Sequence, residues 1–179
     1  MYSGWINVRF NNSIHKCSEP GHIIEHYEYL SNPSKDCRKK IAESLINDLK
    51  EEGSIIIYSS FEKTIINNLG QLFPDLSPEL SSLINRMTDL EAIIRKNYYH
   101  PGFHGSTSIK NTLLVLVPDM TYEGLDISEG DSAMAAFAYL VISKYENSDI
   151  ETIKRNLLDY CKQDTLAMVK LHQQLAEYA

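Results

Sequence analysis

Glu62 is the first residue that could carry chemistry, because it follows directly after a segment expected to form a buried strand. Three consecutive isoleucines in residues 54–60 (SIIIYSS) predict a strand covered on both faces, and residues 61–72 (FEKTIINNLGQL) predict the helix after it. Proteins of the α/β class bind ligands at the carboxyl ends of such strands. Glu62 could therefore bind a metal ion; the alternative is an acidic residue that only complements the helix dipole.

Tyr160 and Asp164 form the second candidate group. Residues 149–177 predict one long helix, on which residues four apart share a face. The carboxylate could bind a metal ion while the phenol orients a water molecule beside it. A chain with eleven tyrosines also contains this spacing by chance, so the pair gains meaning only together with Glu62.

The histidines have the composition of a metal site but an unfavourable setting. His100 and His104 flank a Pro-Gly pair that prevents the helix needed to align them, so we expect no metal there. A second group lies on a predicted hairpin, where strand alternation would scatter the side chains over both faces. We therefore expect no zinc site from His15, Cys17, His22 and His26.

The elements expected to position these residues alternate between strand and helix and then become mostly helical. Strands are predicted at 5–15 and 22–30, with Gly21 in the turn between them. A helix at 35–51, the strand at 54–60 and the helix at 61–72 follow. Beyond Pro74 we expect one or two short helices within 78–96 around a short strand near 87–90, loops at 97–108 and 118–130, and helices at 108–117, 131–145 and 149–177. This order predicts an α/β sandwich that begins partway through.

The composition is that of one ordinary soluble domain covering residues 1–179, with 43% hydrophobic and 23% charged residues. A net charge of -7 argues against a standing electrostatic grip on nucleic acid, although clustered carboxylates around cations would reverse the local charge. The three cysteines form no CxxC pair, which indicates free thiols in a reducing compartment. Neither a signal peptide nor a membrane-spanning segment is evident, so we expect a cytoplasmic location.

Together, the candidate residues resemble two of the three motifs of DnaQ-like 3′–5′ exonucleases. Residues 58–62 (YSSFE) resemble the motif with an acidic residue after the strand that follows the first helix. Residues 160–164 (YCKQD) resemble the Tyr-x-x-x-Asp motif of the last helix. The remaining motif, Asp-x-Glu on the first strand, is absent, since no acidic residue precedes Glu19.

A closer resemblance, to a bacterial family of unknown function grouped with ribonuclease-H-like folds, covers nearly the whole chain. It rests on residues 55–69, 98–127, 130–137 and 157–171. At position 59 this chain has Ser where the family usually has Asn. The resemblance implies a mixed sheet flanked by helices that lacks its central first strand, so that the other strands rearrange, borrow a strand or leave an exposed edge through which a homodimer could form.

The resemblance also implies a chemistry. Two Mg²⁺ or Mn²⁺ ions held by four carboxylates hydrolyse the phosphodiester bond in such enzymes. Here it would assign Glu62 and Asp164 to the metal, Tyr160 to the water, and Lys110, Ser106 and His104 to the 3′ end of single-stranded DNA or RNA. With two carboxylates missing, we expect metal binding and hydrolysis to be weak or absent. The alternative is a non-catalytic module that binds nucleic acid or protein.

Overall fold

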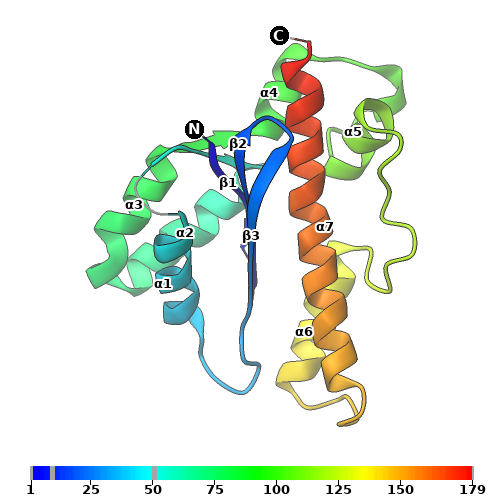
Figure 1. The fold of residues 1–179 in the computed structure, drawn as a ribbon. Helices are drawn as coiled ribbons and strands as arrows, with labels where there is room; N and C mark the ends of the chain where they lie inside the picture. Colours follow the sequence, from blue (N-terminus) through cyan, green and yellow to red (C-terminus); the bar gives the residue numbers. More distant parts are fainter. Residues whose placement is uncertain (1, 9–10, 50–51, 179) are drawn as a thin grey trace.

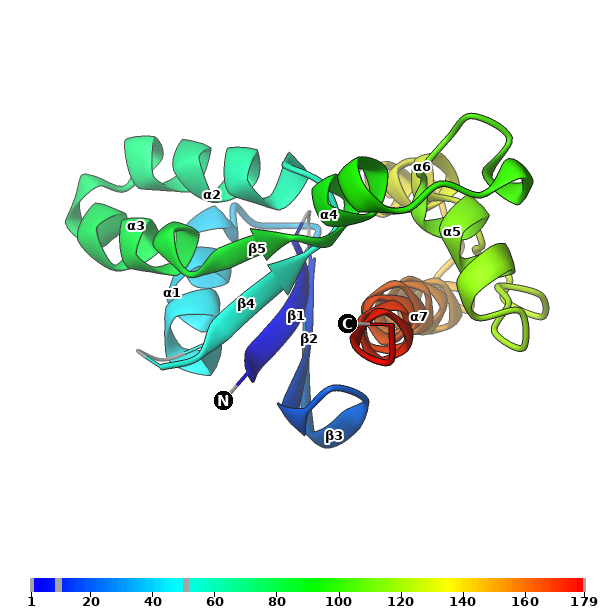
Figure 2. The ribbon, with the colours of Figure 1, turned by 90° about the horizontal axis from the view of Figure 1, so that it is seen from above.

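The computed structural model describes residues 2–8, by their backbone, and residues 11–49 and 52–178. Over these ranges the chain forms a five-stranded sheet with helices on both faces (Figures 1 and 2). The strands are β1 (Tyr2–Val8), β2 (Asn11–Glu19), β3 (His22–Leu30), β4 (Ser54–Ile57) and β5 (Met87–Asp89). The helices are α1 (Arg38–Leu49), α2 (Phe61–Leu72), α3 (Ser77–Asn85), α4 (Leu90–Asn97), α5 (Ile109–Leu116), α6 (Gly130–Val141) and α7 (Ile150–Ala176), with 3₁₀ turns at Pro74–Leu76 and Pro101–Phe103.

The strand order is β3-β2-β1-β4-β5, with β1 at the centre. β1 is parallel to β4, and β4 is parallel to β5, whereas β2 runs antiparallel to both of its neighbours. The carboxyl ends of β1, β4 and β5 therefore meet at one edge of the sheet, called the carboxyl edge below. Asn7, near the end of β1, pairs with Ser13 at the start of β2, so this end of β2 also lies at the carboxyl edge.

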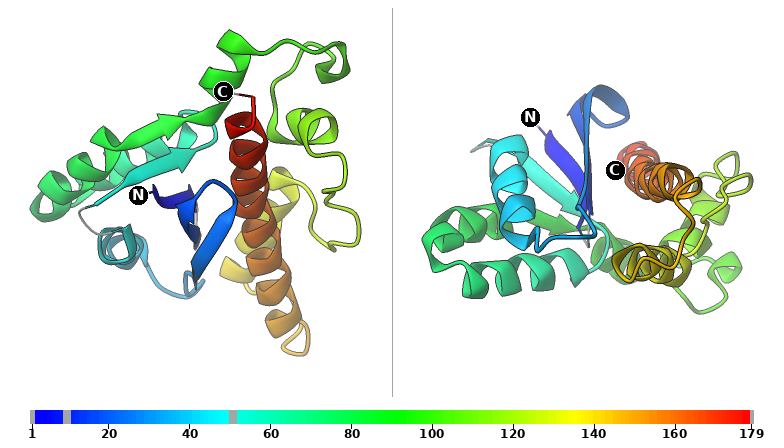
Figure 3. Two further views of the ribbon diagram at one scale, coloured as in Figure 1. Left: turned by 45° about the horizontal axis from the view of Figure 1, so that its top comes forward. Right: turned by 90° about the horizontal axis from the view of Figure 1, so that it is seen from below.

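Helices α1, α2 and α3 cover one face of the sheet, α7 covers the other face, and α5 and α6 pack on α7 (Figures 2 and 3). The side chains of β4 alternate between two hydrophobic cores, as the isoleucine run predicts. Ile55 and Ile57 enter the core beneath α1–α3, and Ile56 enters the core beneath α7. None of the described helices is long and apolar enough to cross a membrane.

The β2–β3 hairpin turns at Gly21, which has a left-handed φ of 82°. A Cβ atom at this position would lie 2.4 Å from the Cδ atom of Gln173 on α7. The left-handed backbone favours glycine here, whereas the close approach involves only the flexible end of the Gln173 side chain, which can move aside. This contact fixes the hairpin tip against the C-terminal half of α7, where Figure 1 shows the two side by side.

The N-terminal segment differs from the sequence prediction. The single strand expected at 5–15 is two strands, β1 and β2, and β1 occupies the central position that we expected to be vacant. We expected the strands to rearrange, to borrow a strand or to leave an exposed edge. The strands rearrange: β1 lies between β2 and β4, so the backbone groups of both have a neighbouring strand with which to pair. The edge strands of the sheet are consequently β3 and β5. The homodimer stays a prediction, but the open central edge on which we based it is filled by β1.

The remaining elements agree in type and order with the prediction, and their ends shift by a few residues. The strand expected at 54–60 ends at Ile57, because the backbone turns at Ser59 with a φ of 78°. The helix expected at 131–145 ends at Val141, shortly before Ser143, which has a φ of 53°. The helix expected at 35–51 starts only at Arg38.

Candidate functional site

Glu62 lies in the first turn of α2, immediately beyond the carboxyl end of β4. Its side chain is only 6% exposed. Glutamates are almost never this buried unless they are paired, whereas a residue that only complements a helix dipole stays at the surface. The burial therefore means that the Glu62 carboxylate needs a partner, which an acidic residue that only complements a helix dipole would not need.

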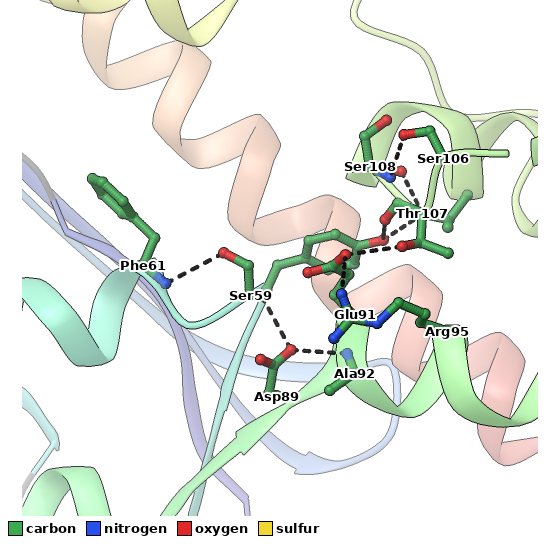
Figure 4. A network of polar contacts seen from close by, with 11 residues as sticks. Ser59, Phe61, Asp89, Glu91, Ala92, Arg95, Ser106, Thr107 and Ser108 are labelled. Carbon is green, nitrogen blue, oxygen red and sulfur yellow. Dashed lines mark hydrogen bonds and ion pairs between the residues drawn. The ribbon is translucent and has the colours of Figure 1, made fainter.

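Asp89 and Ser59 tie the ends of β4 and β5 together at the same edge (Figure 4). The Oδ1 atom of Asp89 accepts hydrogen bonds from the backbone N–H of Ser59, at 3.2 Å, and of Ala92, at 3.0 Å. Asp89 thus caps α4 and holds the turn that leads from β4 to α2. The structure thus gives this carboxylate a structural task.

Asp164 lies in the middle of α7, on the other face of the sheet, and is 8% exposed. Its Oδ1 atom accepts a hydrogen bond of 2.7 Å from the hydroxyl of Tyr122. The Tyr122 ring also lies 6.3 Å from the ring of Tyr160, which is buried beside Asp164. Burial and the Asp164 charge raise the pKa of Tyr122 well above its usual value, so the phenol stays protonated and donates.

The neighbours of Asp164 place it at the carboxyl edge. Cys161 accepts a 2.7 Å hydrogen bond at Sγ from the Nδ2 of Asn11, and the hydroxyls of Thr165 and Ser13 are 2.8 Å apart. Asn11 and Ser13 begin β2, directly beyond the end of β1. Helices α2 and α7 both pack against β1. Glu62 and Asp164 thus approach the same end of the central strand from opposite faces of the sheet.

Tyr122 was not among the predicted site residues. It comes from the segment between α5 and α6, which the sequence predicts only as a loop. Three side chains hold this loop in place: Gln163 donates to the Thr121 carbonyl at 2.7 Å, Asn156 to Asp126 at 2.9 Å, and Lys110 to the Ser128 carbonyl at 2.6 Å. The one sequence signal that included Tyr122 was its place in the unusual stretch 98–127.

Lys110 is committed to this loop. Besides its bond to Ser128, its ammonium group forms an ion pair with Glu129 and lies 5.2 Å above the centre of the Tyr122 ring. The phosphate contact predicted for Lys110 would need these interactions to break. In the described structure the side chain holds Tyr122 over Asp164 instead.

Ser106 lies in a groove that faces the start of α5, and His104 precedes it in the loop. The groove has a volume of about 540 Å³ and is lined by Tyr58, Ser59, Glu91, Arg95, Ile109 and residues 105–108. Ser108 caps α5 by accepting from the N–H of Asn111 at 3.4 Å. Tyr58, which also lines the groove, donates to the Thr107 carbonyl at 2.6 Å. His104 is exposed in a left-handed turn with a φ of 49°.

The structure brings His15 and His26 together, contrary to the expected scatter. Directly opposed residues of antiparallel strands share a face, and His15 pairs with His26, with ring centres 4.4 Å apart. The Nδ1 of His15 and the hydroxyl of Thr165 are 2.9 Å apart, and the Nε2 of His26 and the hydroxyl of Ser13 are 3.0 Å apart. Burial, and then the neighbouring His26 and Lys162, lower the pKa of His15 to about 4. This pair joins the sheet to α7.

The residues present do not fit a two-ion centre. Among the residues whose side chains are described, no three His, Cys, Asp or Glu residues gather in a way that could hold a metal ion. The sequence of β1, YSGWINV, contains no acidic residue. One oxygen of Asp164 already accepts the Tyr122 hydroxyl. Glu62 and Asp164, which approach the central strand from opposite faces of the sheet, therefore do not by themselves make a two-ion centre.

The comparisons with known proteins identify a family and no activity. No curated protein and no solved structure matches the chain. A family model described as a domain of unknown function, DUF2779, matches residues 2–108, which is more than half of the chain. The matched region ends at Ser108, the residue that caps α5, and contains Glu62 and most of the groove. The chain therefore belongs to the DUF2779 family.

Proposed function

We propose that this chain is a ribonuclease-H-like domain related to DnaQ-type 3′–5′ exonucleases, in which hydrolysis of DNA or RNA is impaired. The observation that carries the proposal is the approach of Glu62 and of the Tyr160–Asp164 pair to one end of the central strand. These residues are the ones that the resemblance assigns to the metal and the water. Their burial at this edge supports a role beyond ordinary surface charges.

The same geometry explains why hydrolysis should be slow. A two-ion mechanism needs several carboxylates that neutralise the ions and fix their separation. The strand at the centre of the sheet supplies none, and Tyr122 occupies an oxygen of Asp164. Glu62 and Asp164 therefore mark the position of the site without completing a two-ion centre.

The groove beside the carboxyl edge is the proposed place for the 3′ end of a single strand. The start of α5 lines the groove, and a helix N-terminus suits a phosphate through the N–H groups other than that of Asn111, which Ser108 accepts. Arg95, whose side chain is 66% exposed, adds a positive charge, and Ser106 adds a hydroxyl. Arg95 lies 3.5 Å from Glu91, a separation long enough for a phosphate to compete for the guanidinium.

The test uses a single-stranded DNA and a single-stranded RNA, each with a fluorescent 5′ end, at low salt. We expect binding in EDTA that weakens by about tenfold in Arg95→Gln, since one charge-assisted phosphate contact is lost. Lys96→Gln is the matched control, because it removes the same charge from the next, exposed position of α4. Equal binding by Arg95→Gln and Lys96→Gln, or no binding by the wild type, would refute the groove as the place where the oligonucleotide binds.

Hydrolysis is tested on the same oligonucleotides in Mn²⁺. We expect slow shortening from the 3′ end that Asp164→Ala and Glu62→Gln both abolish. Shortening that survives either substitution would refute the assignment of the site.

A non-catalytic binding module is the second candidate, and the Tyr122–Asp164 hydrogen bond favours it. A module of this kind would bind the oligonucleotides in EDTA and leave them intact in Mn²⁺ at every enzyme concentration. It would also keep its affinity in Glu62→Gln.

A further inference from the structure

A second cavity lies away from the carboxylates, between the end of β3 and the α6–α7 connection. Its volume is about 700 Å³, within the range of roughly 300–1,000 Å³ that is usual for small-molecule sites. One wall is the segment from Tyr29 to Ser34, and the other is formed by Leu140, Ser143, Tyr145, Asn147 and the first residues of α7. Neither Glu62 nor Asp164 lines it, and Figure 1 shows the α6–α7 turn at the end of the molecule opposite α4.

Ser31 is the feature of this cavity that packing does not explain. Its side chain lines the cavity and is 7% exposed, and its hydroxyl has no hydrogen-bond partner among the described residues. A buried hydroxyl without a partner is destabilising unless something in the cavity supplies the bond. The hydroxyl therefore indicates a polar ligand.

Positive charge converges on the same cavity. Lys154 and Arg155 line it from the first turns of α7. Lys154 also forms an ion pair of 2.6 Å with Glu151, whereas Arg155 is exposed and takes part in no ion pair between described residues.

The start of α7 adds a third feature. Asp149 precedes the helix in a helical conformation and makes no side-chain capping bond, so the first N–H groups of α7 are not satisfied by the capping residue. Ile150 and Glu151, which carry two of these groups, line the cavity. A helix N-terminus attracts anions through these donors and its dipole.

We propose that this cavity binds a phosphate-bearing small molecule with a flat ring. The phosphate is placed between Arg155, the first turn of α7 and the Ser31 hydroxyl, which together supply charge and directed donors. Tyr29 and Tyr145 are among the residues that line the remaining volume, and aromatic residues there suit a ligand with a flat ring. This cavity is separate from the carboxyl edge, so the proposal does not rest on the proposed function.

Calorimetric titration with adenosine 5′-monophosphate, ribose 5-phosphate and inorganic phosphate tests the proposal. We expect the nucleotide to bind most tightly, and its affinity to fall by about tenfold in Arg155→Gln and in Ser31→Ala. Lys96→Gln, an equal charge change on α4, should bind as the wild type does. Absence of binding, equal losses in the Lys96 control, or a nucleotide no tighter than ribose 5-phosphate would overturn the proposal.

Ser31→Ala carries a second readout that a purely structural serine would not give. Removing a buried hydroxyl without a partner should raise the melting temperature of the unliganded protein while it weakens binding. A lower melting temperature together with unchanged binding would show that the hydroxyl serves the fold, against the proposal. Oligonucleotide binding at the groove beside α5 should be unchanged in Arg155→Gln and Ser31→Ala. A failure of the cavity proposal is therefore distinguishable from a failure of the proposed function.

Discussion

The hydrogen bond from Tyr122 to Asp164 can be removed with little change in shape by Tyr122→Phe. Both residues are at most 8% exposed and the bond is 2.7 Å long, so the carboxylate loses a donor that water cannot readily replace. A hydrogen bond to a charged group contributes about 1.5–3 kcal/mol. For a chain of this size, that loss lowers the melting temperature by about 3–12 °C.

The assay is urea unfolding followed by circular dichroism, with thermal unfolding alongside it. Tyr139→Phe is the control, because Tyr139 is 47% exposed and its hydroxyl reaches water; we expect a change below about 0.5 kcal/mol. A double-mutant cycle with Asp164→Asn assigns the loss to this pair. In the Asp164→Asn background the acceptor is neutral, so Tyr122→Phe should cost about 1 kcal/mol less.

Two results would refute the reasoning. One is a Tyr122→Phe variant within about 0.5 kcal/mol of the wild type, which would mean that the bond contributes nothing to folding. The other is a full loss of stability that persists unchanged in the Asp164→Asn background. In that case the Tyr122 hydroxyl would act through a different partner.

Three further changes test the fold around the site. The pKa of His15 is lowered to about 4 from an ordinary 6.5, so protonation of this histidine opposes folding. The free energy of unfolding should therefore be highest above about pH 6.5 and fall by roughly 3 kcal/mol by pH 4. His15→Gln should flatten this part of the stability–pH curve, and an unchanged curve would contradict the argument. Gly21→Ala should lower the free energy of urea unfolding by about 1–2 kcal/mol, because alanine disfavours the left-handed backbone. Gln173→Ala should remove any added clash with the new methyl group but leave this backbone cost, so full recovery of stability in the double variant would contradict the backbone argument. Ser59→Asn should raise the melting temperature by about 1–2 °C, since Asn tolerates the φ of 78° better than Ser, and a decrease would mean that the Ser59 hydroxyl matters more than the backbone.

The sequence predicts the regular helices and the buried strand β4 well, because local patterns determine them. The isoleucine run of β4 shows burial on both faces, and the spacing of apolar residues predicts α2 and α7 almost to their ends. Position 59 illustrates a finer signal. The resemblance implies Asn at this position, and Asn suits a left-handed backbone that becomes visible only in the structure.

Two features depend on contacts between distant parts of the chain, and local pattern cannot predict them. Residues 5–15 alternate like one strand, but the strand pairs of β1 with both β2 and β4 divide the segment and fill the centre of the sheet. Tyr122 lies in a loop without periodicity, and its position depends on Lys110, Asn156 and Gln163 from two helices. Its bond to Asp164 spans 42 residues of sequence.

The central claim is that Glu62 and Asp164 face one site at the end of β1. Asn7 pairs with Ser13, whose hydroxyl contacts α7, so Asn7→Asp adds a carboxylate of the same size at that end of the strand. Calorimetric titration with Mn²⁺ is the measurement, and Asn68→Asp on exposed α2 surface is the charge-matched control. We predict that Asn7→Asp binds Mn²⁺ at least about tenfold more tightly than the wild type and the control, and that either Glu62→Gln or Asp164→Asn removes the gain. A gain that survives Glu62→Gln, or equal binding by the Asn68→Asp control, would contradict the claim.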